Sequence, residues 1–292
     1  MVTDGTYQAV FVVSTKGVVV IDVPPTIGHN LVYAIGNTTS LPITHLVYSH
    51  SHADHIGGVS LLLDAFPNHK IKTIAHSATA SQLSAVADPN RPVPKTTFQD
   101  TYSIQQGNQT IQLSYKGLNH IDGNIFIYLP EQKVLMLVDV VYPGWTPFDR
   151  LGEVSSVPGF IKAHDQILEY DFEHYVGGHL DRSGARQDVE TQREYINNLF
   201  ENCKHTIELS ATADPALSGE KILSATLAEN PGNSWAAFKA YLDTITSHCA
   251  NITNNKWASR LAAADVYQVS NAGVMIESLR IDYGILGPFG NK

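Results

Sequence analysis

Short runs of apolar and β-branched residues, separated by turn-forming residues, occupy much of the first two thirds of the chain. Residues 8–13 and 18–21 are two such runs, and the segment between them contains Ser, Thr and Gly. Short runs that are apolar throughout are typical of strands buried on both faces. The pattern therefore predicts a buried β-hairpin at the start of the chain.

Strand-like and helical patterns alternate in the following segment. The runs 45–48 and 71–75 favour strands, whereas residues 27–35, 56–66 and 77–86 have helical periodicity or a helix-forming composition. This β-α-β-α order predicts a partly parallel sheet that is covered by helices.

Two further hairpins are predicted after this region. Residues 96–105 and 110–115 flank one short turn, and residues 124–129 and 134–138 flank another. The segment 88–94, which precedes both hairpins, contains three prolines and is expected to be a loop that lines the site.

The character of the sequence changes toward the C-terminus. Residues 191–207, 215–229 and 234–250 are helical by periodicity and by their content of Ala, Leu, Glu and Lys. We therefore expect a catalytic domain over residues 1–210 and a helical extension over residues 211–292, packed on the same domain.

Composition places the chain among globular proteins and disfavours several partners. Hydrophobic residues make up 43% and charged residues 16% of its 292 residues, which is enough to bury a large core. The formal net charge of −9 disfavours nucleic-acid binding, which depends on clustered Lys and Arg. No apolar run approaches the ~18 residues that a membrane span requires, so we expect a soluble protein without a membrane partner.

The compartment stays open at this point. No signal peptide is visible, so the cytoplasm is the default, and secretion is the alternative if an N-terminal segment was removed. Cys203 and Cys249 are the two cysteines, far apart in sequence. Two separate reduced thiols are expected, with a disulfide as the alternative.

The candidate chemistry begins at His50, where six residues carry three imidazoles and one carboxylate, from His50, His52, Asp54 and His55. Neutral imidazole nitrogens and ionised carboxylate oxygens are the ligands that a borderline divalent ion such as zinc prefers. The run follows the strand pattern 45–48 and precedes a helical pattern, so we expect it on a loop at a strand end. His50 and His52 alternate and would point the same way, whereas Asp54 and His55 can turn toward a second ion.

This run resembles the His-x-His-x-Asp-His signature of the metallo-β-lactamase superfamily. Three more residues stand where that family places ligands: His120 in a Gly-x-x-His loop, Asp139 after an apolar run, and His179 after Gly-Gly. The first of these loops has one residue more than the family's Gly-x-His. The resemblance covers about residues 7–200. It implies an α/β fold, a four-layer αββα sandwich with the metals along one edge, followed here by the C-terminal helical extension.

The resemblance also implies two divalent metal ions, with zinc as the default and iron, manganese or cobalt as alternatives. Two ions lower the pKa of a shared water toward ~7 and supply hydroxide near neutral pH. Asp54 is expected in addition to relay a proton to the leaving group. The expected ligands are His50, His52 and His120 for the first ion, Asp54, His55 and His179 for the second, and Asp139 as a bridge between both.

Two other residues have roles that the resemblance suggests and their own sequence context leaves open. Tyr142 stands three residues after Asp139, as in the lactone-hydrolysing branch, where a tyrosine points its hydroxyl at the substrate carbonyl. The alternative is a tyrosine packed beneath the loop. Asp22 ends a strand where the family often supports a ligand histidine, and its alternative role is that of a turn residue before Pro24.

The remaining histidines are expected to have no part in the site. Single scattered histidines are usually surface or satisfied core residues, and His164, in a helix predicted for residues 160–170, is expected on the surface or at a helix cap. The eight histidines outside the motifs are His29, His45, His69, His76, His164, His174, His205 and His248.

The expected activity is hydrolysis of a small molecule at an acyl carbon. In the family, true β-lactamases generally lack the bridging aspartate, so Asp139 and Tyr142 together favour a lactone or a related cyclic ester or amide. A thioesterase of the glyoxalase II kind and a β-lactam hydrolase are the alternatives among enzymes. A metal-dependent binding module is the alternative outside catalysis, although such modules normally lack one or more ligands. The C-terminal helices of family members often shape the pocket or a dimer contact, so a homodimer is also expected.

Overall fold

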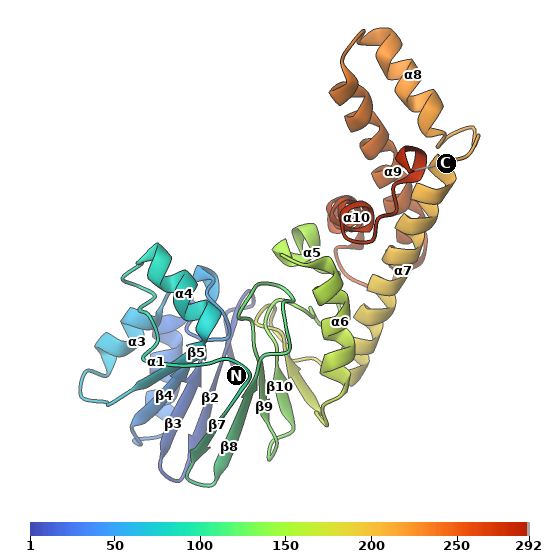
Figure 1. The fold of residues 1–292 in the computed structure, drawn as a ribbon. Coiled ribbons are helices and arrows are strands. Elements are labelled where there is room, and N and C mark those ends of the chain that lie inside the picture. Colours follow the sequence, from blue (N-terminus) through green and yellow to red (C-terminus); the bar gives the residue numbers. More distant parts are fainter. Residues whose placement is uncertain (291–292) are drawn as a thin grey trace. The chain divides into compact units, whose positions relative to one another are not determined.

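The structure is a computed structural model that describes residues 1–290. The chain forms two compact units (Figure 1). The first unit consists of Met1–Pro143 and Lys162–Glu190, and the second consists of Gly144–Ile161 and the chain from Thr191 onward. The expected division after residue 210 stays a prediction; the compact units divide elsewhere, because residues 144–161 pack with the C-terminal helices.

The first sheet of the first unit has six strands in the order β1-β2-β3-β4-β5-β6. The strands from β3 to β6 run parallel, as the alternation of strands and helices predicted, and β1, β2 and β3 are antiparallel. The strands are β1 (Val2–Thr3), β2 (Gln8–Ser14), β3 (Gly17–Ile21), β4 (Ile43–Val47), β5 (Lys72–His76) and β6 (Thr96–Phe98).

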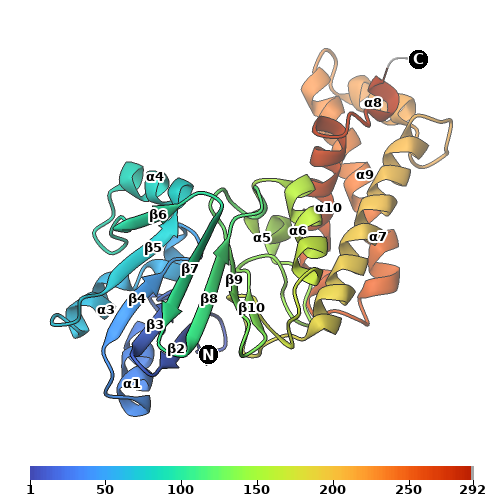
Figure 2. The ribbon, with the colours of Figure 1, turned by 60° about the horizontal axis from the view of Figure 1, so that its bottom comes forward.

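The second sheet has five strands in the order β11-β10-β9-β8-β7. Figure 2 labels its strands β7 to β10. Strands β7 to β10 are joined by antiparallel pairs, and β11 runs parallel to β10. The strands are β7 (Thr101–Gln106), β8 (Gln109–Ser114), β9 (Phe126–Leu129), β10 (Val134–Met136) and β11 (His174–Val176).

The single strand expected over residues 96–105 is wrong. Strand β6 pairs with β5 in the first sheet, whereas β7 pairs with β8 in the second, so the chain crosses between sheets at Gln99 and Asp100. Phe98 at the end of β6 is buried in the core between the sheets. The residues before and after this crossing have the same strand-like pattern, with Thr on both sides and Tyr and Ser after it. Periodicity therefore could not locate the crossing.

The core explains why the early strands are apolar throughout. Val18 and Val20 of β3 contribute to the cluster under the helices, while Val19 and Ile21 contribute to the cluster between the two sheets. Successive side chains of a strand point to opposite faces, so β3 is buried on both. Full burial of one such side chain stabilises the fold by about 1.5–3 kcal/mol.

Helices cover the outer faces of the sandwich. Leu31 and Ile35 of α1 pack into the cluster on the outer face of the first sheet. Beside the second sheet, Gln166 of α6 donates to the Lys116 carbonyl, and the ring of Tyr170 stacks on Phe126. The predicted two-sheet α/β architecture with a C-terminal helical extension is confirmed. The helices named so far and their neighbours are α1 (Gly28–Thr38), α2 (Ala53–Ile56), α3 (Val59–Ala65), α4 (Ser77–Val86) and α6 (Val157–Leu168).

Two glycines shape the segment after the His-rich run. The helix expected over residues 56–66 is divided into α2 and α3 at Gly57 and Gly58. The Gly58 amide donates to the Val23 carbonyl at 2.8 Å, and a Cβ on Gly58 would lie 2.9 Å from that oxygen. A side chain is therefore excluded where this loop packs against the strand end, as expected for glycine at a close backbone approach.

The second unit is helical within the described residues. Helix α10 was not predicted from the sequence. Helices α6 and α7 begin in one unit and end in the other. The remaining helical elements are α5 (Asp149–Glu153), α7 (Arg186–Ser210), α8 (Gly219–Glu229), α9 (Ser234–Trp257), α10 (Ala264–Ile281) and the 3-10 turn η1 (Gly287–Phe289).

The expectation of two separate thiols is wrong. Cys203 of α7 and Cys249 of α9 form a disulfide, and both are fully buried. The pairing depends on how the two helices pack, which their separation of 46 residues does not reveal.

Replacing both cysteines by alanine should lower the free energy of unfolding of this unit by about 4 kcal/mol, judged from the loop that the disulfide closes. Denaturant unfolding monitored by circular dichroism measures this loss. The reduced wild-type protein should behave like the double variant. Equal unfolding midpoints for the oxidised wild type and the variant would contradict the disulfide.

Among residues 1–290, no helix combines the length and the apolar character that crossing a membrane requires.

Candidate metal centre

The seven predicted ligands come together at one edge of the sandwich. They follow strands β4, β8, β10 and β11, and two of them, Asp54 and His55, lie on the short helix α2 instead of the expected loop. They form two adjacent groups, and within each group one ligand atom per residue lies within 4.8 Å of the others. The groups are His50, His52, His120 and Asp139, and Asp54, His55 and His179.

The Asp139 carboxylate faces both groups. Its Oδ2 lies 3.5 Å from Nε2 of His50 and 3.3 Å from Nε2 of His120 in the first group. The same oxygen lies 3.2 Å from Nε2 of His55, and Oδ1 lies 2.9 Å from Nε2 of His179, in the second group. One carboxylate thus lies between two sets of imidazoles, where a bridging ligand would be needed.

The backbone of Asp139 is held in an uncommon conformation. Its φ is +62°, in the left-handed region, which costs of order 1–3 kcal/mol for a residue other than glycine. The Asp139 amide donates to the Gly177 carbonyl at 3.1 Å, and this bond holds the strand end in place. Strain of this kind is typical of functional positions.

Asp54 is the more solvent-exposed of the two carboxylates among the candidate ligands. Its Oδ2 lies 3.4 Å from Nε2 of His55 and 3.9 Å from Nε2 of His179, and 40% of its side chain is exposed. The Asp139 side chain is 5% exposed. Asp54 is therefore accessible to solvent at the second group of ligands, whereas Asp139 is enclosed.

Partners on the far ring nitrogens orient two of the imidazoles. Nδ1 of His179 lies 3.2 Å from the Thr6 carbonyl, and Nδ1 of His50 lies 3.0 Å from Oγ of Ser49. A carbonyl can only accept, so Nδ1 of His179 carries the proton and its Nε2 is left to coordinate. Both Nε2 atoms face the centre of the site.

The Asp22 side chain supports the segment that carries the ligands by accepting a hydrogen bond from its backbone. Its Oδ1 accepts from the Ser49 amide at 2.8 Å, one residue before His50. Its second oxygen and Nδ1 of His55 are buried, and neither makes a hydrogen bond. Burial raises the pKa of Asp22 to about 6, against the opposing effects of His55 and Ser49.

The electrostatics favour neutral imidazoles in the first group. Burial lowers the pKa of His50 well below its usual value and that of His120 to about 4. For His55 burial acts in the same direction, but Asp139, Asp54 and Asp22 outweigh it and raise the pKa to about 9. Burial raises the pKa of Asp139, yet the neighbouring histidines hold it well below its usual range.

The donor set fits a metal ion. Nε2 of His50 and Nε2 of His55 are buried and have no hydrogen-bond partner, although each points at the cluster. A buried polar atom without a partner costs about 1–3 kcal/mol, and coordination of a cation would remove that cost. Imidazole and carboxylate ligands in these numbers suit zinc or a similar transition metal.

A family model matches more than half of the chain. The family model described as the metallo-beta-lactamase superfamily matches residues 2–195. The chain belongs to this superfamily. The resemblance inferred from the four ligand motifs is confirmed, whereas the lactone-hydrolysing branch is not distinguished by the match.

Two curated relatives share part of this sequence. The alpha subunit of 2,4-dinitroanisole O-demethylase from Nocardioides sp. is 26% identical over 196 residues, covering 64% of this chain and 56% of the relative. The type 2 metallo-beta-lactamase of Elizabethkingia meningoseptica is 32% identical over 131 residues, covering 44% and 50%. The chain thus spans about half the length of these two relatives.

Solved superfamily structures share the fold. A metallo-beta-lactamase from Pontibacter korlensis superposes with a TM-score of 0.57 at 20% identity, covering 66% of this chain and 87% of that one. The metallo-beta-lactamase IND-7 gives a TM-score of 0.56 at 23% identity, covering 65% and 86%. At these identities the likeness concerns the fold alone.

Tyr142 lies beside the ligands, inside the protein. It is 2% exposed, and its ring centre lies 5.8 Å from that of His179. Burial, and after it the charge of Asp139, raises the pKa of its hydroxyl well above the usual value, so the group stays protonated. Its proposed contact with substrate stays a prediction.

The proline-rich loop 88–94 lies against the ligand loop. Nη1 of Arg91 donates to the Ser51 carbonyl at 2.8 Å, while its Nε donates to Asp88 at 2.7 Å. The Tyr48 hydroxyl donates to the Pro92 carbonyl at 3.0 Å. The loop was expected near the site, but sequence reasoning missed Arg91, because no local signal distinguishes this arginine from a solvated one.

His164 is not a surface or capping residue, and this expectation is wrong. It is fully buried, on the inward side of α6. It lies outside both ligand groups.

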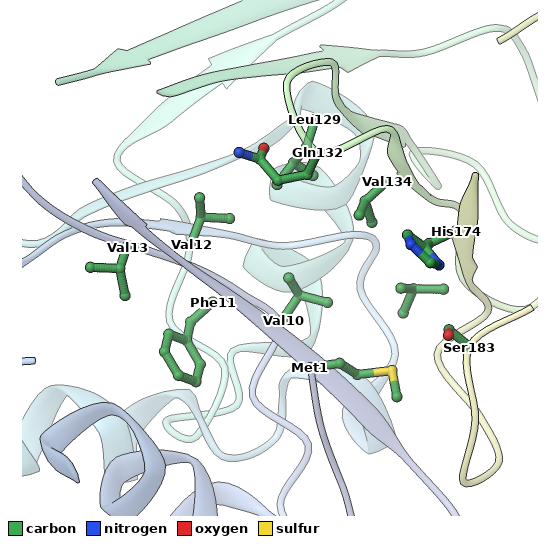
Figure 3. A pocket seen from close by; sticks show the side chains of 11 residues that line it. Met1, Val10, Phe11, Val12, Val13, Leu129, Gln132, Val134, His174 and Ser183 are labelled. Atoms are coloured by element: carbon green, nitrogen blue, oxygen red, sulfur yellow. The ribbon is translucent and has the colours of Figure 1, made fainter. Parts of the chain in front are cut away.

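A separate cavity lies beside β2, β10 and β11 (Figure 3). It has a volume of about 440 Å³, and its wall is mainly apolar. None of the seven predicted ligands lines it. The lining includes Val10, Val12, Leu129, Val134 and Val176. This cavity is therefore distinct from the candidate centre.

Gly178→Ala should weaken metal binding by at least about tenfold, the effect typical of residues that support ligands. Gly178 has a φ of +85°, and a Cβ there would lie 2.5 Å from Cγ1 of Val138 and 3.1 Å from Cε1 of His55. Competition with a chromophoric chelator measures the affinity. Gly232→Ala is the matched control, because it has a φ of +75° and open space around the added atom. Equal losses in both variants would contradict the contact with His55.

Proposed function

We propose that the protein is a dinuclear metal-dependent hydrolase that acts at an acyl carbon of a small molecule. The observation that carries the proposal is the position of the Asp139 carboxylate, with Oδ2 3.3 Å from His120 and Oδ1 2.9 Å from His179. When bound, two divalent ions supply polarisation of the carbonyl and hydroxide at neutral pH. His50, His52 and His120 would hold one ion, and Asp54, His55 and His179 the other.

The chain's own groups would complete the reaction. Asp54 is the more exposed carboxylate and lies at the second group, so it can carry a proton to the leaving oxygen or nitrogen. Tyr142 keeps its proton, so its hydroxyl can donate a hydrogen bond to the oxyanion that develops on the substrate. The Asp139 side chain is only 5% exposed, so electrostatic interactions of its carboxylate are stronger than they would be in water.

A lactone, or a related cyclic ester or amide, is the proposed substrate class. A bridging Asp139 and a tyrosine three residues later support this class through the resemblance to the lactone-hydrolysing branch. The names of the curated relatives point in other directions, to β-lactam hydrolysis and to demethylation of 2,4-dinitroanisole. Thioester hydrolysis and a binding role without catalysis are the remaining alternatives.

A substrate panel tests the proposal. Zinc-loaded protein is assayed with lactones, β-lactams, thioesters and 2,4-dinitroanisole, before and after removal of metal by a chelator. We expect the highest kcat/KM for a lactone and loss of activity on chelation. Faster turnover of another class would replace the lactone proposal, and no turnover by folded, metal-loaded protein would contradict the hydrolase itself.

The disulfide indicates the kind of cellular compartment in which the protein folds. Stable disulfides form in oxidising compartments and are rare in the cytosol. The buried Cys203–Cys249 bond therefore favours an oxidising compartment over the cytoplasmic default. A small-molecule substrate, the absence of a nucleic-acid partner and a homodimer stay predictions.

A further inference from the structure

Tyr7 is an aromatic side chain at the metal centre that belongs to neither ligand group. Its ring centre lies 4.9 Å from that of His179 and 5.7 Å from that of His55, and it meets the His55 ring edge to face. The side chain is only partly buried. The ring therefore covers one side of the second ligand group and still faces solvent.

The backbone around Tyr7 is fixed from both sides. Oδ1 of Asp4 accepts from the amides of Thr6 and Tyr7 at 2.9 Å each. The next amide, that of Gln8, donates to the Gly178 carbonyl at 2.8 Å, and Tyr7 itself forms an isolated β-bridge with His179. The ring is thus presented by an ordered segment joined to the ligand strand, and little entropy is lost when a ligand contacts it.

Exposure distinguishes Tyr7 from the other tyrosine of the site. Tyr142 also lies beside His179, with ring centres 5.8 Å apart, but it is 2% exposed. A molecule that approaches the second ligand group from solvent would meet the face or edge of Tyr7 before it met Tyr142. Aromatic rings attract apolar and aromatic groups through burial and through their quadrupole.

We infer that Tyr7 is a specificity-determining residue, whose ring packs against the group attached to the reacting carbonyl and favours an aromatic group there over a methyl group. The inference rests on the proposed metal-dependent function, because it needs the carbonyl to be held at the two ligand groups. The ring, and not the hydroxyl, makes the selective contact.

Binding of two hydroxamates to the metal-loaded protein tests this inference without turnover. Hydroxamates chelate metal ions. Phenylacetohydroxamate differs from acetohydroxamate by a phenyl group on the carbon next to the carbonyl. We expect the wild type to bind the phenyl compound about tenfold more tightly, from one added aromatic contact and its burial. Calorimetry gives both affinities, and elemental analysis gives the metal content.

Tyr7→Ala should reduce this preference to less than about threefold, while acetohydroxamate affinity and metal content change by less than about twofold. Tyr7→Phe keeps the ring and should keep the preference. Tyr7→Val, which suits the extended backbone, is a second truncation in case the alanine variant does not fold. Tyr33→Ala is the matched control, because Tyr33 lies on α1 and is 72% exposed.

An unchanged preference in the truncated variants would overturn the inference, and so would a loss in Tyr7→Phe equal to that in Tyr7→Ala. In both cases acetohydroxamate binding would persist, and the proposed metal centre would stand. If neither hydroxamate bound to metal-loaded protein, the proposed function would fail together with the inference.

Discussion

Asp139→Ala should lower kcat/KM on the best substrate by at least about a thousandfold, which corresponds to ~4 kcal/mol of transition-state stabilisation. The Asp139 carboxylate faces His55 and His120 through one oxygen and His179 through the other. Its removal would take one ligand from each of two metal positions and leave their positive charges less compensated. Steady-state kinetics and metal analysis of the same preparation measure both consequences.

Two variants bracket this prediction. His174→Ala changes an exposed histidine on β11, the strand that leads to the ligand His179, and should retain activity within about twofold. Asp54→Asn should be nearly as severe as Asp139→Ala, because it weakens one ligand and removes a proton relay. Equal losses for His174→Ala and Asp139→Ala would contradict the ligand assignment.

Tyr142→Phe should lower kcat by about tenfold to several hundredfold, the range seen when one hydrogen bond to a developing oxyanion is removed. The substitution keeps the ring that packs 5.8 Å from His179, so folding and metal content should not change. A hydrogen bond made only in the transition state affects kcat rather than KM. Pre-steady-state and steady-state rates on the same substrate measure this effect.

A kcat for Tyr142→Phe within twofold of the wild type would make Tyr142 a packing residue. Its exposure of 2% agrees with that alternative as well as with a catalytic hydroxyl in a closed site. The preference for lactones would then fall, and thioester or β-lactam hydrolysis would become equally good proposals.

The ligand set was predictable because its spacing is local. His50, His52, Asp54 and His55 lie within six residues, and each of the other ligands follows a strand. Parallel strand ends meet at one edge of a sheet, so four motifs at strand ends predict one site. The hairpin at the start of the chain and the parallel strands of the first sheet were also predictable, because the pattern of each element lies within a short segment.

Features that depend on packing between distant segments were not predictable. Tyr7 reaches the site because the N-terminal segment pairs with His179, and no pattern around Tyr7 signals that contact. The disulfide depends on the packing of α7 against α9, and its cysteines carry no motif. The crossing at Gln99 between the two sheets interrupts a run whose strand pattern continues unchanged.

The metal stoichiometry of the folded protein tests the central claim most directly. Protein loaded with excess zinc and freed of unbound ions is analysed for metal per chain, while activity is followed as metal is added back to the chelated form. The two ligand groups around Asp139 predict close to two ions per chain and full activity only when both positions are filled. At most one ion per chain in protein that is folded and fully active would contradict the bridged two-metal centre.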